Sequence, residues 1–418
     1  MFRMFFKVRY FLRSTVSLFD AAENVAIGQS VGNPKVRNGW ETPELWERAG
    51  CRIEGDTEWM KTVKEGEVTI AFPIANIDLA TDGISQLLCQ IMGGQLDIDT
   101  IRDCHVLDLD IPDEIEKKYF LGPKFGFAKV RDFVGAHGKP LLGGIIKPKV
   151  GCDTKTLLEV IKQMVEGGCN FIKEDEIMAN AVHAPLSERV PLICEYLKDK
   201  KVVYCFCING DADVVLDRVK FVHQCGGNGV HVNFWSGLGI YKRIRELDLP
   251  IHIHYQKSGI SILTDKRNPF HIEWSVVCKL AGMAGVDFIH AGMLGGYSDN
   301  GREEITKVLG ILGKYGTVTA LSCGMHPGLV QAIRKEIGDD WMANCGGAIH
   351  GHPDGTYAGA RAMRQAIDGT GGLEYDAAIK KWGFVETLPM TPNADANLVA
   401  EIVAKDGRIG AQSQWRGY

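Results

Sequence analysis

The chain has 418 residues, of which 24% are charged and 45% hydrophobic, and its formal net charge is −5. This composition is typical of a globular protein with a large core, and the length suggests two domains. The small negative charge, without a long basic run, argues against a nucleic-acid surface. No apolar segment reaches the length that spans a membrane. Twelve cysteines without a Cys-x-x-Cys motif indicate reduced thiols and a cytoplasmic location.

The first part of the chain, residues 1–137, mixes expected strands with expected helices. Residues 5–12 and 68–73 have the composition of strands, and residues 18–28 and 81–92 have the pattern of helices. This mixture predicts an N-terminal α+β domain of the ferredoxin-like kind, with a mostly antiparallel sheet. The apolar start of the chain is interrupted by Arg and Lys, so we interpret it as a first strand rather than a signal peptide.

The second part, residues 138–418, alternates short β-rich runs with amphipathic segments of helical length. Eight such units predict a parallel (β/α)8 barrel, a TIM barrel, followed by additional C-terminal helices after about residue 370. The expected strands are 142–147, 170–173, 202–208, 229–234, 251–254, 288–290, 318–321 and 342–345. The expected helices include 154–166, 213–224, 274–284 and 327–337. The active sites of such barrels lie at the carboxyl ends of the strands.

A lysine and two acids stand together where the second barrel strand ends. Side chains alternate along a strand, so Lys173 and Asp175 point the same way, and Glu176 can join them where the strand becomes a loop. A buried lysine beside two carboxylates is either a structural ion pair or part of a metal site. If the lysine carried a carbamate, all three residues would offer the oxygen ligands that Mg²⁺ prefers. The position on the barrel favours the metal site.

Other strand ends carry groups suited to proton transfer. Lys147 and Lys149 flank a proline after the first barrel strand, where they are either acid–base groups or ordinary surface lysines. His254 and His290 stand at the ends of the fifth and sixth strands. Each is a candidate for proton transfer or for binding a substrate oxygen, although a single histidine is more often a packing residue.

Two glycine-containing loops follow the seventh and eighth strands. The first contains Ser322 and Gly324, and the second contains Gly346 and Gly347. Glycines let a phosphate group approach backbone N–H groups, and loops at these two strands are the usual phosphate position in TIM barrels. A glycine pair alone often marks a turn. Together, the two loops predict a site for a small phosphorylated substrate.

These motifs resemble, in order, those of ribulose-bisphosphate carboxylase (RuBisCO) and its RuBisCO-like relatives. The matching segments are 144–149, 167–176, 252–254, 290–292, 322–324, 346–347 and 351–353. The resemblance implies an obligate homodimer with shared active sites, which can be part of a higher oligomer. It implies that CO2 carbamylates Lys173, which then holds Mg²⁺ with Asp175 and Glu176. It also implies that Lys147 is an acid–base group, that His254 and His290 contact the substrate, and that the two glycine loops bind its hydroxyl and phosphate groups.

Several departures from the carboxylases point to a different reaction. Tyr255, which we expect beside the substrate, replaces an arginine, and Tyr297 replaces the essential lysine of the loop after the sixth strand. The segment Gly122-Pro-Lys124-Phe-Gly126 lacks the carboxylases' asparagine and resembles that of the RuBisCO-like enolases of methionine salvage. In those enolases the lysine of this segment is the base, so Lys124 is a rival to Lys147. We therefore predict a RuBisCO-like protein of form IV that does not fix CO2.

The first functional hypothesis is Mg²⁺-dependent enolisation of a phosphorylated keto-sugar derivative, ending in tautomerisation or isomerisation. A second is decarboxylation of a phosphorylated 3-oxo sugar acid, which passes through a similar carbanion. A third is a binding or regulatory protein without catalysis, and the intact Lys147, Lys173, Asp175 and Glu176 argue against it. True carboxylation of ribulose bisphosphate ranks last.

Overall fold

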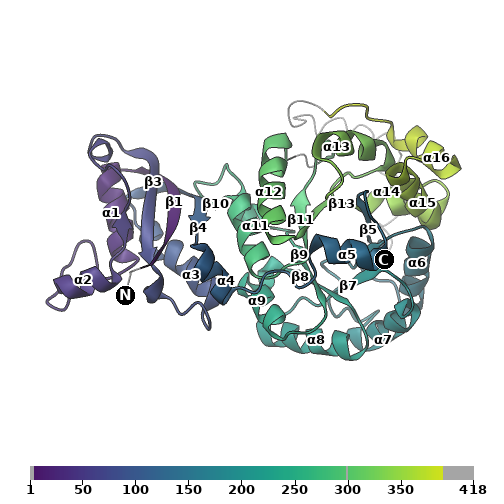
Figure 1. Cartoon of the computed structure of the whole chain (residues 1–418), viewed down its shortest axis with the longest axis horizontal. Helices are drawn as coiled ribbons and strands as arrows, with labels where there is room; N and C mark the ends of the chain where they lie inside the picture. Colours follow the sequence, from purple (N-terminus) through teal and green to yellow (C-terminus); the bar gives the residue numbers. More distant parts are fainter. Residues whose placement is uncertain (1–3, 298–299, 389–418) are drawn as a thin grey trace, which may run out of the picture. The chain divides into compact units, whose positions relative to one another are not determined.

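The computed structural model describes residues 4–297 and 300–388, which contain a five-stranded sheet and a closed eight-stranded barrel (Figure 1). The chain divides into two compact units. One consists of the described parts of Met1–Gly126, Ile208–Ile289 and Ile311–Thr317, and the other of those of Phe127–Cys207, His290–Gly310 and Val318–Tyr418. The boundary that we expect near residue 137 remains a prediction.

The N-terminal sheet has the strand order β10-β4-β1-β3-β2. β1 pairs antiparallel with both β3 and β4, whereas β10 joins β4 in parallel. The strands are β1 (Phe5–Ser14), β2 (Arg52–Ile53), β3 (Glu65–Pro73), β4 (Ile101–Asp110) and β10 (Phe270–Ile272). The structure confirms the two expected strands, β1 and β3, and adds three that the sequence did not predict. The expected strand at the start of the chain is described from residue 4, since residues 1–3 lie outside the described residues.

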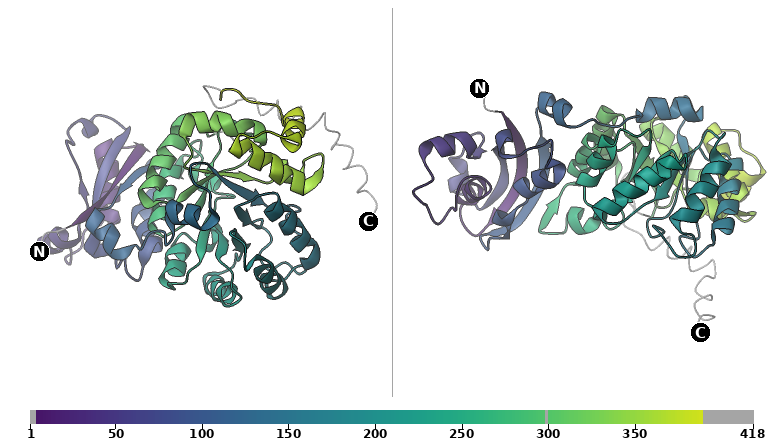
Figure 2. Two further views of the ribbon diagram at one scale, coloured as in Figure 1. Left: turned by 45° about the vertical axis from the view of Figure 1, so that its right-hand side comes forward. Right: turned by 90° about the horizontal axis from the view of Figure 1, so that it is seen from below.

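Helix α1 (Leu18–Gly28) has the predicted bounds and packs against β1 and β3 (purple in Figure 2). Its first turn is capped by Ser17, whose hydroxyl accepts a hydrogen bond from the backbone N–H of Asp20 at 3.1 Å. The other helices of this part of the chain are α2 (Pro43–Ala49), α3 (Gly83–Ile91) and α4 (Asp113–Tyr119). The segment expected as helix 81–92 is therefore confirmed as α3.

The barrel has the predicted eight parallel strands in the order β11-β12-β13-β5-β6-β7-β8-β9. They are β5 (Leu141–Ile145), β6 (Phe171–Lys173), β7 (Val203–Cys207), β8 (Gly229–Asn233), β9 (His252–Gln256), β11 (Phe288–Gly292), β12 (Val318–Leu321) and β13 (Met342–Cys345). Every residue of β7, β8, β9 and β11 is buried. Strands of a parallel sheet are buried in this way because helices cover their outer face.

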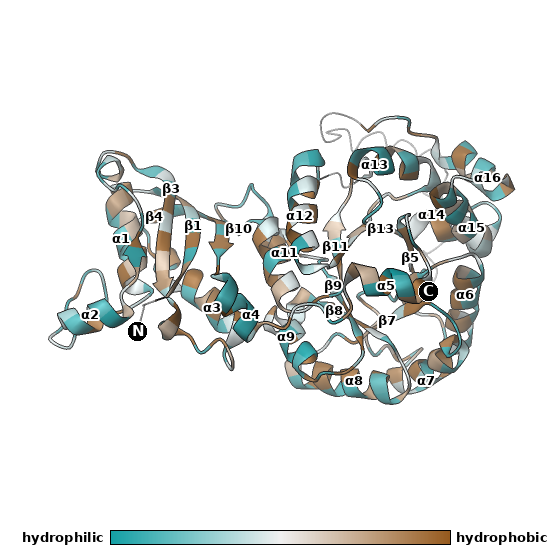
Figure 3. Ribbon diagram, in the orientation of Figure 1, coloured by the Kyte–Doolittle hydropathy of each residue, from teal (hydrophilic) through white to brown (hydrophobic). Residues whose placement is uncertain are grey.

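The barrel helices owe their positions to amphipathic sequences. In α6 (Thr154–Glu166), Leu157, Ile161 and Met164 form the buried face, and Asp153 caps the first turn. Figure 3 shows hydrophobic and hydrophilic residues on the same helices, for example α6 and α8. The remaining helices are α5 (Gly126–Val134), α7 (Leu186–Leu197), α8 (Ala212–Gln224), α9 (Gly239–Glu246), α10 (Ser261–Thr264), α11 (Trp274–Met283), α12 (Arg302–Tyr315), α13 (Val330–Ile337), α14 (Gly347–His350), α15 (Gly355–Asp368) and α16 (Leu373–Trp382).

The expected C-terminal helices are represented by α16, and residues 389–418 lie outside the described residues. None of the described helices is long and apolar enough to cross a membrane.

The glycine pair of β5 is explained by crowding on both faces of the strand. A Cβ atom at Gly143 would lie 2.9 Å from the side-chain oxygen of Asn344, and one at Gly144 would lie 2.2 Å from the methyl group of Met164 on α6. Only glycine lets β5 pack this closely against β13 on one side and α6 on the other.

A buried ion pair joins α9 to the segment before β11. The guanidinium of Arg245 donates to the carboxylate of Asp287 at 2.6 Å, and both side chains are almost completely buried. The same carboxylate accepts hydrogen bonds from the backbone N–H groups of Ile253 and Phe125, at 2.8 and 3.2 Å. Asp287 therefore connects β9, the start of β11 and the segment that precedes α5.

We expect Arg245→Met to destabilise the chain strongly, because it leaves the carboxylate of Asp287 buried without its cation. The free energy of unfolding should fall by about 3–5 kcal/mol, as for other broken buried pairs. The matched control is Arg243→Met on the same helix, where the side chain is 58% exposed, and its effect should stay within about 0.5 kcal/mol. Urea denaturation measures both, and equal effects would contradict the assignment.

Candidate active site

The predicted lysine and acids lie close together at the carboxyl end of β6. Lys173 is only 1% exposed, and its ammonium nitrogen lies 3.7 Å from a carboxylate oxygen of Glu176. The same nitrogen donates to the backbone carbonyl of Glu174 at 3.1 Å. Burial lowers the pKa of Lys173, against the opposite effect of Glu176 and Asp175. Burial therefore favours the neutral form of this amine, whereas the neighbouring carboxylates favour its charged form.

Lys147 reaches the same group from the loop that follows β5. Its ammonium donates to the carboxylate of Asp175 at 2.6 Å, and its side chain is 30% exposed, whereas that of Asp175 is buried. Strand pairing places Ile145 opposite Lys173, which brings the ends of β5 and β6 side by side. Lys149, two residues further on, is exposed. The structure therefore joins Lys147, Lys173, Asp175 and Glu176, which we call the lysine–acid cluster.

Glu174, between Lys173 and Asp175, faces the other side of the strand. Its carboxylate accepts two hydrogen bonds from the guanidinium of Arg189 on α7, at 2.8 and 2.9 Å. It also accepts hydrogen bonds from the hydroxyl of Tyr204 and the backbone N–H of Cys207, at 3.1 and 2.7 Å. Because both members of the ion pair are fully buried, this carboxylate fixes the end of β6. In the sequence, only the alternation of side chains along the strand distinguishes Glu174 from Asp175.

The cluster has too few acidic groups to bind a metal by itself. Among residues 4–297 and 300–388, no group of three or more His, Cys, Asp or Glu side chains is arranged to hold a metal ion. Asp175 and Glu176 supply two carboxylates, so a third anionic ligand would have to come from a modified Lys173. This composition fits the predicted carbamate, because that modification adds the missing oxygen donor at the right residue.

His254 is half of a buried imidazole pair that the sequence did not reveal. Its Nδ1 lies 3.0 Å from the Nδ1 of His231 on β8. One of the two nitrogens must donate and the other accept, so the tautomers of the two rings are linked. His252, at the start of β9, stacks on Phe125 instead, with ring centroids 3.9 Å apart, and burial lowers its pKa to about 3. The two histidines of β9 therefore have different surroundings.

Tyr255 does not lie where we expected it. Its ring is completely buried and packs against Tyr241 of α9 and Trp274 of α11, at centroid distances of 5.0 and 6.1 Å. It therefore faces the helices outside β9, because side chains alternate along a strand and those of His254 and Gln256 point the other way. This packing does not fit the predicted contact with a substrate.

Lys124 lies near the amino-terminal end of β9. Its ammonium donates to the side chain and to the backbone carbonyl of Asp248, at 2.7 and 2.8 Å. Asp248 precedes β9, whereas active-site groups of a barrel follow the strands. Within its own subunit, Lys124 is thus directed to the amino-terminal end of the strand.

The loops after β11 and β12 form a second group of candidate residues. Ser322 is buried, and its backbone N–H donates to the carbonyl of Gly292 at 3.0 Å. Gly324 has a φ of +107°, and a Cβ atom there would lie 2.7 Å from the backbone nitrogen of Tyr297. His290 lies beside Cys323, with 3.7 Å between Nε2 and Sγ. The backbones of the two loops are therefore in contact, and His290 lies beside Cys323 of the second loop.

The last predicted loop lies beside Lys147. A Cβ atom at Gly346 would lie 3.4 Å from the Cε of Lys147, whereas one at Gly347 would meet no atom within 4 Å. Neither amide atom of the buried Asn344, on β13, has a hydrogen-bond partner in the described part of the chain. Buried amides are normally satisfied, so Asn344 is a candidate for a bound group. In the sequence, Asn344 is marked only by its place two residues before Gly346.

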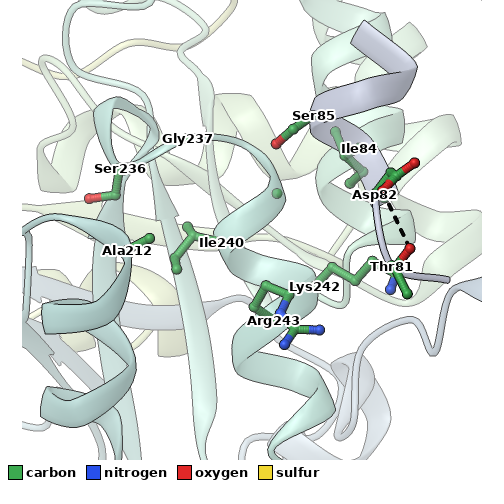
Figure 4. A pocket seen from close by; sticks show the side chains of 12 residues that line it. Thr81, Asp82, Ile84, Ser85, Ala212, Ser236, Gly237, Ile240, Lys242 and Arg243 are labelled. Carbon is green, nitrogen blue, oxygen red and sulfur yellow. Dashed lines mark hydrogen bonds between the residues drawn. The ribbon is translucent and has the colours of Figure 1, made fainter. Parts of the chain in front are cut away.

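A separate hollow of about 230 Å³ lies between the starts of α3 and α9 (Figure 4). Lys242 and Arg243 line it together with Ser85 and Ser236. Lys242 donates to the backbone carbonyl of Ala80 at 2.9 Å and pairs with Glu246. None of the predicted site residues lines this hollow, so it is distinct from the lysine–acid cluster.

Comparison with known proteins identifies the family. The family model of the ribulose bisphosphate carboxylase large chain, catalytic domain, matches residues 126–315 and 309–382. The chain is 30% identical over 412 residues to 2,3-diketo-5-methylthiopentyl-1-phosphate enolase of Geobacillus kaustophilus, covering 90% of this chain and 98% of the enolase. It is 29% identical over 405 residues to ribulose bisphosphate carboxylase of Pyrococcus furiosus, covering 90% of this chain and 94% of the carboxylase.

A solved structure supports the same assignment. A rubisco-like protein from Alicyclobacillus acidocaldarius superposes with a TM-score of 0.78 at 27% identity, covering 91% of this chain and 100% of that chain. The barrel, the order of its motifs and these matches agree. The chain therefore belongs to the ribulose bisphosphate carboxylase large-chain family, and its relatives in that family include rubisco-like proteins as well as carboxylases.

Proposed function

We propose that this chain is a Mg²⁺-dependent enzyme that enolises a phosphorylated keto-sugar derivative and releases a tautomer or isomer of it. The observation that carries the proposal is the lysine–acid cluster, in which Asp175 binds Lys147 and Glu176 lies beside Lys173. A relative named as an enolase, 30% identical to this chain, supports the reaction type without fixing the substrate.

The charges of the cluster support a divalent cation. With Lys147 and Lys173 protonated and both acids ionised, the four side chains are formally neutral. The Lys173 ammonium first loses one proton, and addition of CO2 to the resulting amine forms an N–C bond and releases a second proton, so that a cation becomes an anion. The cluster then carries two excess negative charges, which a divalent cation would balance. Buried charge without compensation is costly, so modification and metal binding should occur together.

Lys173, Asp175 and Glu176 would hold the ion. Bound Mg²⁺ would polarise the ketone of the substrate and stabilise the negative charge of the enolate. We propose that Lys147 moves the proton, because its ammonium reaches the cluster while part of its side chain remains exposed. In its neutral form it would take the proton from the carbon next to the ketone, and in its charged form it would return a proton.

The remaining residues would bind and orient the substrate. We propose that His254, held by His231, and His290, beside Cys323, contact substrate oxygens. Ser322 and Gly324 would bind a hydroxyl or phosphate, and the open backbone at Gly346 and Gly347 would accept the phosphate. Asn344, buried without an internal partner, would add an amide to this side of the site.

Tyr297 supports a reaction other than carboxylation. It stands where the family resemblance puts an essential lysine, and burial raises its pKa to about 12, with a contribution from the neighbouring Cys323. The phenol therefore stays neutral at physiological pH and offers no positive charge to a newly formed carboxylate.

Exchange of substrate protons with solvent tests the enolisation. With Mg²⁺ and bicarbonate, NMR should show deuterium entering one of a panel of keto-sugar phosphates. Lys173→Met should slow this exchange by at least about a thousandfold, since the metal group would be lost. The control Lys155→Met, an exposed lysine of α6, should leave it unchanged. Exchange that survives in Lys173→Met would refute the proposed metal site. Release of CO2 from a phosphorylated 3-oxo sugar acid would instead favour the decarboxylase.

Substitution of the two rival lysines tests which one is the base. Lys147→Ala should lower the exchange rate by about 10²–10⁴-fold, the usual contribution of a general base. Lys124→Ala should lower it less than Lys147→Ala does, because in its own subunit Lys124 is bound to Asp248 before β9. Lys118→Ala, an exposed lysine of α4, is the control.

A larger loss of exchange in Lys124→Ala than in Lys147→Ala would identify Lys124, acting in a partner subunit, as the base. Co-expressed Lys124→Ala and Lys147→Ala subunits would then regain exchange as mixed oligomers. Mixed oligomers no faster than the average of the two single variants would place Lys124 in its own subunit's site instead.

Labelled bicarbonate tests carboxylation directly. Incubation with ribulose bisphosphate, Mg²⁺ and ¹⁴C-bicarbonate should yield no acid-stable label, because the loop after β11 carries neutral Tyr297 in place of a cation. Acid-stable label in the sugar-derived product would overturn the assignment as a non-carboxylating protein.

A further inference from the structure

Cys323 occupies an unusual backbone position on the rim of the barrel. It stands between Ser322 and Gly324 with a φ of +83°, in the left-handed region that side-chain-bearing residues rarely adopt. Its carbonyl oxygen would lie 2.3 Å from a Cβ atom placed at Gly296, so the loops after β11 and β12 are in direct backbone contact. Residues held in such sparsely populated backbone conformations cluster at functional sites.

The thiol of Cys323 lies between two polar groups. On one side its sulfur lies 3.7 Å from the Nε2 of His290, and on the other it forms a hydrogen bond with the hydroxyl of Tyr297. His290 is 7% exposed, whereas Tyr297 is 61% exposed. The three side chains thus form a continuous polar path from the surface of the barrel to a buried imidazole.

The chemistry of the three groups determines which of them donates in each hydrogen bond. Because the pKa of Tyr297 is raised to about 12, its hydroxyl remains protonated and donates to the sulfur. The thiol hydrogen is then available to donate to a ring nitrogen. This arrangement requires the neutral form of His290 with its proton on Nδ1, the nitrogen on the far side of the ring.

We propose that Cys323 is a positioning residue for His290, which orients the imidazole and selects its tautomer through the path Tyr297–Cys323–His290. The proposal rests on the proposed function only in placing His290 beside the substrate. In that setting, Cys323 would keep the proton of the neutral ring on Nδ1. Its strained backbone would be retained because a glycine at this position has no thiol.

A purely structural cysteine would behave differently. Buried cysteines usually act as small apolar groups, and seven of the twelve cysteines of this chain are buried. Cys323 is only partly buried and contacts two groups that exchange protons. Substitutions that change proton donation at nearly constant size therefore separate the two roles.

The test follows His290 itself and needs no substrate. Deuterium exchange at the imidazole C2 position, read by mass spectrometry of a peptide that contains only His290, gives the titration midpoint of this residue. Cys323→Gly suits the left-handed backbone and removes the thiol. The midpoint of His290 should rise by about half a pH unit, because a hydrogen bond donated to the neutral ring is lost. Cys323→Ser should return it towards the wild-type value, since the hydroxyl replaces the thiol donor.

Two further variants complete the experiment. Tyr297→Phe should move the His290 midpoint in the same direction by a smaller amount, and Cys89→Ser, on the exposed side of α3, should not move it. In the exchange assay, Cys323→Gly should lower kcat about tenfold with KM within about twofold, and Cys323→Ser should recover part of the loss. An unchanged His290 midpoint in a folded Cys323→Gly protein would overturn the inference. Absence of exchange in the wild type would refute the proposed function. The titration of His290 would still test the role of Cys323 in that case.

Discussion

The arrangement of the candidate site depends on the buried carboxylate of Glu174. Arg189 holds it with two hydrogen bonds, and Tyr204 and the backbone of Cys207 supply two more. With all these contacts on the outer face of the strand end, Lys173 and Asp175 must face the inner side. A fully paired ion pair of this kind contributes little net stability compared with apolar residues, but removal of one partner is costly. Its main effect here is to fix the direction of the neighbouring side chains.

Strand alternation explains why much of the site was predictable from the sequence. The eight barrel strands are continuous apolar runs between helices, and each begins or ends within about two residues of its expected position. Lys147, Lys173, Asp175 and Glu176 follow directly from those strand ends. Tyr255 was misplaced because the same rule, applied to its neighbour His254, directs it outward against α9 and α11.

Other features were not predictable because they depend on contacts between distant segments. β4 was missed because charged and polar residues interrupt its alternation, and its identity comes from pairing with β1. The pairing of His231 with His254 requires the register of β8 and β9. The contact between Cys323 and His290 depends on a left-handed residue that the sequence does not mark. Overall sequence identity does not distinguish the two reactions either, since a carboxylase and an enolase match this chain at 29% and 30%.

The parallel pairing of β10 with β4 has a consequence for how the chain can be divided. β10 belongs to the segment between β9 and α11, yet its hydrogen bonds are made to a strand encoded far upstream. A barrel produced without the first 126 residues would expose the backbone edge of Phe270–Ile272 and the apolar side chains beside it. Unpaired edges of this kind associate with one another, so such a fragment should be prone to aggregation. Deletions and fusions are therefore better placed at the ends of the chain than at the junction between sheet and barrel.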